Sequence, residues 1–207
     1  MKFYIVRHGE TYNNAENIHQ DGNSELSERG LKQAEYLANR FEHLQIDTII
    51  ASPYVRTKKT AEVISEKWNI PLEFSDLFIE VKRPSVFHNK KADHPQVISI
   101  KEKIKENLHD PKWHYSDEEN LQDTIERAKK AVELLQNRGE ESILIVSHGT
   151  FIRTLLGVMV MGDKLTSEVM WRFRKAFKVE NTGLSLCELV DGKWSIHSWN
   201  DCQHLEK

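Results

Sequence analysis

The stretch Phe3-Tyr4-Ile5-Val6-Arg7-His8-Gly9-Glu10-Thr11 decides how the rest of this sequence is interpreted. Its first four residues are apolar without polar alternation, which predicts a short strand buried on both faces, as in parallel sheets. The strand then delivers an Arg-His pair into a turn that Gly9 permits. Ligand sites of open α/β sheets lie at the carboxyl ends of the strands, and this pair stands at such an end.

A second apolar run ends in the same way. Residues 143–146 are followed by Ser147-His148-Gly149-Thr150. An isolated histidine at a strand end is more often a residue that caps a backbone group, but the recurrence weakens that interpretation. Two strands that each end in a His-Gly turn indicate one site built around two imidazoles, which suit nucleophilic and proton-transfer work near neutral pH.

Length and composition restrict the class of protein. With 207 residues, of which 39% are hydrophobic and 29% charged, the chain fits a single domain with a substantial core. A net charge of -3 gives no bulk reason to expect a nucleic-acid partner. The apolar runs are too short for a signal peptide or a membrane span, and the only cysteines, Cys187 and Cys202, form no metal or thiol motif. We expect a cytoplasmic protein with no membrane partner; the sequence leaves its oligomeric state open.

The order of apolar patterns predicts an α/β fold. Strands are expected at residues 3–6, 46–51, 72–74 and 143–146. Helices are expected from Ser27 to about Phe41, from Ser52-Pro53 onward, at 121–137 and at 151–161. A hairpin is expected over 182–199 with its turn at Asp191-Gly192. This alternation predicts a three-layer sandwich, in which helices cover both faces of a mainly parallel sheet.

Two segments show no clear period. Residues 11–25 are polar and contain Gly22, so they are expected to form a loop. Residues 76–120 contain Pro84, Pro95 and Pro111 among aromatic and charged residues. We expect this second segment to be an insertion or lid with short helices within one domain of residues 1–207.

Arg56 adds a third element to the strand-end cluster. It follows the expected strand and Ser52-Pro53, and so lies in the first turn of a helix. Two arginines and two imidazoles at three strand ends are costly to hold together without a bound anion, because like charges repel. Phosphate fits such a cluster, since arginine offers paired N–H donors and helix N-termini add backbone N–H groups.

Several separated motifs now make the chain similar to a known family, the histidine phosphatase superfamily, also called phosphoglycerate mutase-like. The resemblance runs from residue 1 to about residue 205 and implies a phosphoglycerate mutase-like fold. The motifs that carry it are Arg7-His8-Gly9-Glu10-Thr11 with Asn14, Ser52-Pro53-Tyr54-Val55-Arg56-Thr57 with Thr60-Ala61, Ser147-His148-Gly149, and Asn200-Asp201 with His204-Leu205.

The resemblance implies that His8 is a nucleophile. One ring nitrogen would attack phosphorus and form a phosphohistidine, while the other would donate to a backbone carbonyl and fix the tautomer. Arg7 and Arg56 would hold the phosphoryl oxygens. Their charges would also favour the neutral imidazole, because a nearby positive charge opposes protonation.

The resemblance also implies the remaining contacts to the phosphoryl group. His148 would donate to a phosphoryl oxygen as charge develops, together with the backbone at Gly149, and Asn14 matches a family position that contacts the same group. No metal ion or other cofactor is expected, because arginine and histidine do the charge work that Mg²⁺ does elsewhere.

An acid must protonate the departing alkoxide and then act as a base toward water. Glu80 is the expected residue, because it follows the short stretch 76–79 as the family's catalytic glutamate does. A solvated surface carboxylate is the plainer alternative. The next residues, 81–88, depart from the Gly- and Trp-containing turn of many members. Glu10 is an alternative carboxylate, although its family counterpart is usually structural.

Positive charge follows Glu80 in the expected lid. Lys82 and Arg83, with His88, Lys90 and Lys91 beyond them, could contact a second anionic group of the substrate, or could equally form a solvated surface. Glu119-Asn120 loosely matches a family position before a helix, and its role stays open.

These residues predict a metal-independent phosphomonoester hydrolase that acts on a small phosphorylated metabolite. The alternative is a phosphoglycerate mutase with the same intermediate; the chain is short for those mutases, and their characteristic lid segment is not evident. A binding protein that has lost catalysis is a third interpretation, and the intact Arg7, His8, Arg56 and His148 argue against it. The motifs leave the physiological substrate unnamed.

Overall fold

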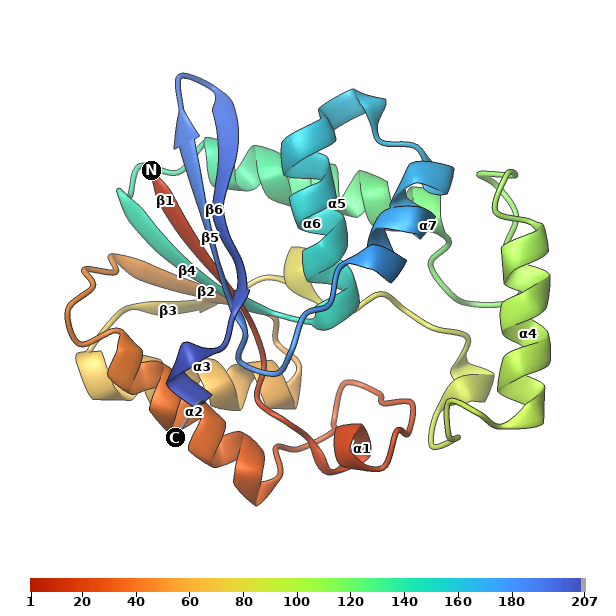
Figure 1. Ribbon diagram of the computed structural model, residues 1–207, viewed down its shortest axis with the longest axis horizontal. Coiled ribbons are helices and arrows are strands. Elements are labelled where there is room, and N and C mark those ends of the chain that lie inside the picture. The colour runs from red at the N-terminus through yellow and green to blue at the C-terminus, as the bar shows by residue number, and fades with distance from the viewer. Residues whose placement is uncertain (206–207) are drawn as a thin grey trace.

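A six-stranded mixed sheet lies at the centre of the computed structural model, which describes residues 1–205 (Figure 1). The strands run in the order β3-β2-β4-β1-β5-β6. The first four strands in this order pair in parallel, and β5 pairs antiparallel with both β1 and β6. The predicted mainly parallel sheet is therefore confirmed. Their bounds are β1 Lys2–Arg7, β2 Thr48–Ala51, β3 Leu72–Phe74, β4 Ser142–Ser147, β5 Leu184–Val190 and β6 Lys193–Asp201.

The pairing of β1 with β4 sets the position of the site. The parallel register places Arg7 opposite Ser147. The two strands therefore end level with each other, and their His-Gly turns emerge side by side. Both strands are buried on their two faces, as their unbroken apolar runs predict.

Helices cover both faces of the sheet, which confirms the predicted three layers (Figure 1). Alternate residues of one strand face opposite cores: Phe3 and Ile5 pack with α5, α6 and α7, whereas Tyr4 and Val6 pack with α2 and α3. The helices are α1 Tyr12–Ala15, α2 Glu28–Arg40, α3 Val55–Trp68, α4 Pro95–Glu106, α5 Leu121–Gln136, α6 Gly149–Met161 and α7 Ser167–Ala176. Short 3-10 turns are η1 Asp76–Phe78, η2 Ser85–Phe87, η3 Gly162–Lys164 and η4 Gln203–Leu205.

Three local predictions need correction. The helix expected to start at Pro53 begins at Val55, because the Val55 N–H donates to the Gly22 carbonyl and the chain stays extended until then. The loop expected at 11–25 contains α1, whose first turn is closed by reciprocal hydrogen bonds between Thr11 and Asn14. Helix α7 was not predicted, and Met170 is its only buried residue.

The segment 76–120 has its own small apolar cluster of Phe87, Val97 and Ile100. Figure 1 shows its helix α4 standing apart from the helices that cover the sheet. The two ends of the segment return to the sheet, where Phe78 packs in the same core as α5 and α6. The start of the segment meets the end of β4, where Ser147 Oγ donates to the Phe78 carbonyl at 2.6 Å, and its end returns beside the start, where the Glu119 N–H donates to the Lys82 carbonyl at 3.0 Å.

Gly9 is required for a reason other than the turn it was expected to permit. The positive φ angles among the described glycines belong to Gly162 and Gly192. A Cβ at Gly9 would lie 2.5 Å from the carbonyl oxygen of Gly30, and a Cβ at Gly30 would lie 1.9 Å from that of Glu10. The two glycines thus allow the loop after β1 to lie directly on the first turn of α2.

Within residues 1–205, none of the helices has the length and apolar character needed to cross a membrane.

Candidate active site

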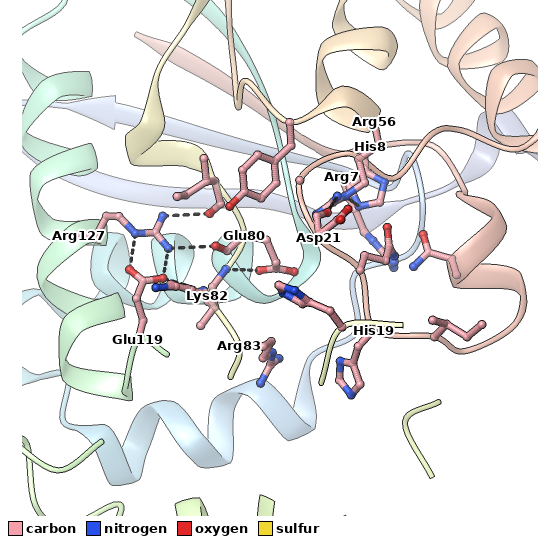
Figure 2. A pocket seen from close by; sticks show the side chains of 18 residues that line it. Arg7, His8, His19, Asp21, Arg56, Glu80, Lys82, Arg83, Glu119 and Arg127 are labelled. Atoms are coloured by element: carbon pink, nitrogen blue, oxygen red, sulfur yellow. Dashed lines mark hydrogen bonds and ion pairs between the residues drawn. The ribbon is translucent and has the colours of Figure 1, made fainter. Parts of the chain in front are cut away.

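His8 and Arg56 line one end of a pocket of about 530 Å³ (Figure 2), and the His148 ring lies directly beside that of His8. His8 follows β1, His148 precedes α6, and Arg56 lies near the start of α3 after β2. All three side chains are at most 3% exposed. The His8 and His148 rings lie with their centroids 5.2 Å apart, so the structure brings together the cluster that the strand ends predicted.

Hydrogen bonds define the tautomer of His8. Its Nδ1 lies 2.7 Å from the Gly9 carbonyl oxygen, which can only accept, so Nδ1 carries the proton. Nε2 therefore holds a lone pair, and it accepts a hydrogen bond from Arg56 Nε at 3.2 Å. The imidazole thus presents an unprotonated nitrogen beside a guanidinium, which is the state a nucleophile needs.

His148 is oriented by Ser52, a partner from the second motif. Its Nε2 lies 2.8 Å from Ser52 Oγ, and the same oxygen accepts from the Tyr54 N–H. We assign the hydroxyl proton of Ser52 to Nε2, which leaves the His148 proton on Nδ1. That Nδ1 is buried without a partner among the described residues. A buried donor without a partner is costly, so a ligand oxygen is its expected acceptor.

The pKa values of both histidines lie well below the usual 6.5. Burial is the main cause, because it penalises the charged ring, and the positive charge of Arg56 lowers both pKa values further. Both rings are therefore neutral at physiological pH. Arg56 and Arg7 both lower the pKa of His8, in agreement with the prediction that nearby arginines favour its neutral imidazole.

These shifts predict that the protein loses stability in mild acid. Unfolded histidines bind protons near pH 6.5, whereas buried His8 and His148 do not, so lowering the pH from about 7.5 to 5.5 favours the unfolded chain. Each ring can reduce the free energy of unfolding by up to ~1.4 kcal/mol per pH unit below that value. Urea unfolding curves across this range measure the slope. His148→Asn should flatten it, whereas an unchanged slope would show that His148 is protonated in the folded protein.

The two predicted arginines are held by backbone carbonyls. Arg7 Nη1 donates to Val179 at 2.8 Å, and Arg56 Nη1 donates to Asp21 at 2.7 Å. Arg7 Nε is buried and has no partner among the described residues. Burial lowers the pKa of both, that of Arg56 to about 10, so both stay charged at neutral pH. Both guanidiniums line the pocket.

Asn14 lines the pocket as well. Its Oδ1 accepts from the Thr11 N–H and from Nδ2 of Asn181, at 3.3 Å each. Because Oδ1 points toward these two donors, the Nδ2 group of Asn14 points away from them. Gly149 opens α6 next to His148, and its backbone lies against the Arg7 side chain, since an added Cβ would be 3.4 Å from Arg7 Cδ.

Glu80 lies in the same pocket, half-buried, with its carboxylate at the start of α6. It accepts hydrogen bonds from the N–H groups of Val81 at 2.8 Å, Phe151 at 3.0 Å and Thr150 at 3.2 Å. Burial acts to raise its pKa, but the charge of Arg83 and these hydrogen bonds outweigh burial and hold the pKa below its ordinary value. Glu80 is therefore a carboxylate in the free protein.

The ion pair of Glu119 with Arg127 braces the chain on both sides of Glu80, and Figure 2 shows it next to that residue. Glu119 accepts from Arg127 Nε at 2.7 Å and Nη2 at 2.8 Å. Arg127 Nη1 donates to the carbonyls of Leu77 and Ile79, each at 2.9 Å. Glu119 also accepts from the Lys82 N–H at 2.9 Å. The position that the sequence left open at Glu119 thus holds the Glu80 loop in place.

The other charged candidates differ in their surroundings. The alternative carboxylate, Glu10, accepts from Ser27 Oγ at 3.0 Å and forms an ion pair with Arg29 at 3.1 Å, at the start of α2. Lys82 and Arg83 both line the pocket. The Lys82 ammonium lies 3.5 Å from Asp117, whereas Arg83 Nη2 donates to Thr150 Oγ1 at 3.3 Å.

Sequence reasoning did not identify Ser52, Arg127 and Asn181 as individual site residues. Ser52 was quoted only as part of a motif, although its place directly after a strand was a usable signal. Arg127 lies inside an amphipathic helix and Asn181 precedes a strand, so neither has a local signal. Among the described residues, no group of three or more His, Cys, Asp or Glu side chains could hold a metal ion.

A family model identifies this arrangement. The model of the histidine phosphatase superfamily (branch 1) matches residues 3–202. The chain belongs to this superfamily. The first three predicted motifs and Asn200-Asp201 lie within the matched residues, whereas His204-Leu205 lie beyond them, and the resemblance to the superfamily is confirmed.

The proteins similar to this chain include some named as phosphoglycerate mutases and others named as phosphatases. A protein of Erwinia tasmaniensis named "Probable phosphoglycerate mutase GpmB" is 27% identical over 215 residues, covering 100% of this chain and 95% of its own. The structure of Bacillus stearothermophilus YhfR superposes with a TM-score of 0.83 at 25% identity, over 99% of both chains. That of Entamoeba histolytica phosphoserine phosphatase in complex with phosphoserine superposes with a TM-score of 0.79 at 23% identity, over 99% of this chain and 98% of its own. The phosphoglycerate mutase-like fold is thereby confirmed.

Proposed function

We propose that the protein is a phosphomonoester hydrolase that works through a phosphohistidine on His8. The observation that carries this proposal is the hydrogen bond from His8 Nδ1 to the Gly9 carbonyl, which leaves an unprotonated Nε2 facing the pocket beside Arg56. The buried, unpartnered N–H groups of Arg7 and His148 supply donors for the phosphoryl oxygens. The phosphatases among the structural neighbours support the same reaction class.

The first step forms the bond between His8 Nε2 and phosphorus and breaks the bond to the leaving oxygen. Arg56 turns its Nε–H from His8 to a phosphoryl oxygen as the substrate enters, so the lone pair becomes available. The negative phosphoryl group raises the pKa of Glu80, because like charges oppose ionisation. Glu80 can then take up a proton from solvent and pass it to the leaving alkoxide.

The second step releases phosphate. Glu80, now a carboxylate, takes a proton from water; the water oxygen bonds to phosphorus, and the bond to His8 breaks. The products are inorganic phosphate, the free imidazole and a protonated Glu80. Departure of the phosphate lowers the pKa of Glu80 again, so its proton returns to solvent and the starting state is restored. We propose that arginine and histidine supply the whole charge stabilisation and that no metal ion or cofactor takes part.

Phosphoglycerate mutase activity is the alternative, which the names of the curated relatives favour. It uses the same phosphohistidine but returns the phosphoryl group to a sugar acid. Phosphate release from p-nitrophenyl phosphate, unchanged by EDTA, is the result expected of the hydrolase. Negligible release, together with isomerisation of 3-phosphoglycerate primed by the bisphosphate, would establish the mutase.

We further propose that the chain is one domain in which segment 76–120 forms a lid over the pocket, and that the substrate is a small phosphorylated metabolite in the cytoplasm. Ile79, Arg83, His88 and Glu119 line the pocket from this segment. A lid that contributes lining residues excludes water from the reacting groups and determines which leaving groups fit.

Glu80→Gln should slow esters with poor leaving groups more than p-nitrophenyl phosphate. An alkyl phosphate leaves as a basic alkoxide that needs a proton, so its turnover should fall by about 10²–10⁴-fold, the usual contribution of general acid–base catalysis. p-Nitrophenolate leaves without a proton, so the loss in its phosphorylation step should be smaller. Burst kinetics separate that step from dephosphorylation. Asp76→Asn, an exposed carboxylate of the same segment, is the matched control. Equal slowing of both substrates would assign the acid to another residue.

A further inference from the structure

Half of the chain's arginines have no carboxylate partner within residues 1–205, and all of these interact electrostatically with Glu80. The sequence contains ten arginines. Five form ion pairs with carboxylates: Arg29, Arg40, Arg127, Arg138 and Arg172. The other five form none with any described residue, and each interacts electrostatically with Glu80: Arg7, Arg56, Arg83, Arg153 and Arg174.

The phosphoryl group accounts for only part of this charge. Arg7 and Arg56 flank His8 and serve the phosphoryl oxygens in the proposed reaction. Glu80 and a phosphoryl dianion together do not balance five guanidinium groups. Three further carboxylates lie within electrostatic reach, but Glu180 acts on Arg7 and Asp21 on Arg56, and Glu119 is already paired with Arg127. Positive charge therefore remains beside Glu80 for a second anionic group.

The remaining three arginines converge on one face of α6. Thr150 and Thr154 are one helical turn apart, so their side chains are neighbours on the helix surface. Arg83 Nη2 donates to Thr150 Oγ1 at 3.3 Å, and Arg174 Nη2 donates to Thr154 Oγ1 at 2.7 Å. The Thr150 N–H, on the same turn, donates to Glu80. The threonines thus hold both guanidiniums on the side of α6 where the catalytic carboxylate lies.

Arg153 joins the cluster from the same helix and anchors α7. Its Nη1 donates to the carbonyl of Arg174 at 2.7 Å and to that of Phe177 at 3.3 Å. Its positive charge and that of Arg83 lower the pKa of Arg174, which burial already lowers, to about 9. The three cations are therefore close enough to repel one another, and holding them together without a bound anion is costly.

Each guanidinium keeps donors for a ligand. Hydrogen bonds to described residues occupy Nη2 of Arg83, Nε and Nη2 of Arg174, and Nε and Nη1 of Arg153. The remaining Nη groups have no partner in that part of the chain. Figure 2 shows Arg83 on the side of the pocket opposite Arg56 and His8, with Glu80 between them. A substrate whose phosphoryl group lies on His8 would extend past Glu80 to Arg83, the member of the three that lines this pocket.

We propose that Arg83, Arg153 and Arg174 form a second anion subsite, and that the substrate is a phosphomonoester whose leaving group carries a carboxylate or a second phosphate. We refer to these residues as the arginine subsite. This inference rests on the proposed hydrolase function, because it places the arginine subsite on the leaving-group side of the reacting phosphorus. Arginine suits either anion, since its planar fork matches carboxylate and phosphate alike.

The test compares alkyl phosphates of equal length that end in a methyl, a carboxylate or a phosphate group. The wild type should prefer an acidic end to a methyl end by about tenfold or more in kcat/KM, since a hydrogen bond to a charged group has about this effect. Arg83→Gln and Arg174→Gln should each reduce that preference by about tenfold. The carboxylate and phosphate series identify which anion the arginine subsite takes. Equal kcat/KM for methyl and acidic ends in the wild type would overturn the proposal.

Arg172→Gln is the matched control, because Arg172 is exposed on the same helix and pairs with Glu168. It should leave both the preference and the basal activity as in the wild type. If Arg174→Gln does not fold, the preference for acidic over methyl ends is measured instead in Arg174→Lys and Arg83→Gln. A loss by Arg83→Gln that is equal for methyl and acidic ends would show a structural role and would contradict the arginine subsite.

A binding measurement separates this proposal from the hydrolase proposal. Calorimetric titration of His8→Ala with the methyl- and carboxylate-ended phosphates needs no turnover. Tighter binding of the acidic ligand that is lost in His8→Ala/Arg174→Gln supports the arginine subsite even if the reaction is not hydrolysis. Equal binding of the two ligands overturns it, whereas the hydrolase proposal fails only if the wild type releases no phosphate.

Discussion

His8→Ala should reduce turnover of p-nitrophenyl phosphate by about 10⁴-fold or more, the scale seen when a covalent nucleophile is removed. The structure gives the reason. Nδ1 is committed to the Gly9 carbonyl, so Nε2 is the one ring nitrogen of His8 that can attack. Arg56 and His148 would remain to bind the phosphoryl group, so substrate affinity should persist while chemistry is lost.

Acid-quenched protein provides the direct readout of this prediction. Wild-type protein mixed with substrate should carry phosphate that is labile in acid and stable in base, and His8→Ala should carry none. His43→Ala, which removes an exposed histidine outside the pocket, should retain both the label and the turnover. Undiminished turnover by His8→Ala would refute a phosphohistidine on His8. His19 and His88 also line the pocket, so the label of each histidine variant identifies which imidazole is phosphorylated.

Arg56→Gln should reduce kcat/KM by about 10²–10³-fold, the usual cost of removing one preorganised donor from a developing negative charge. Arg56 is 2% exposed and donates from Nε to His8, so its charge acts at the reacting nitrogen without screening by water. Glutamine retains an N–H donor but removes the charge. The steady-state rate of p-nitrophenyl phosphate hydrolysis measures the loss.

The same variant should also move the acid limb of the pH profile. The Arg56 charge lowers the pKa of His8, second only to burial, so its removal should raise that pKa and shift the acid limb of kcat/KM to higher pH. Lys59→Gln, which removes an exposed charge one turn along α3, should leave both rate and profile unchanged. A loss of rate without a shift of the acid limb would mean that Arg56 only holds the Asp21 loop.

Much of the fold could be read from short apolar runs because burial on both faces demands them. The strands β1 and β4 are such runs, and their position before a His-Gly turn predicted where the site would lie. Helix α5 was predicted almost to the residue, since Ala128, Ala131, Val132 and Leu135 repeat on one face. In segment 76–120, where burial comes from the small cluster around Phe87, no period was available and only an irregular segment could be expected.

The sequence by itself predicted the cluster of Arg7, His8, Arg56 and His148, because each residue lies at the end of a strand or in the turn or first helical turn that follows it. Only the tertiary structure decided which groups surround it. The β1–β4 register places the two imidazoles together, and the turns of α6 bring Arg83 and Arg174 to the same face. Thr150 contacts Arg83 and Glu80, which lie 67 and 70 positions away in the sequence, and Thr154 contacts Arg174 of another helix. Such partners leave no pattern in a local stretch of sequence. The physical reason is that a strand end is a local property, whereas the balance of charge in a pocket is set by every element that reaches it.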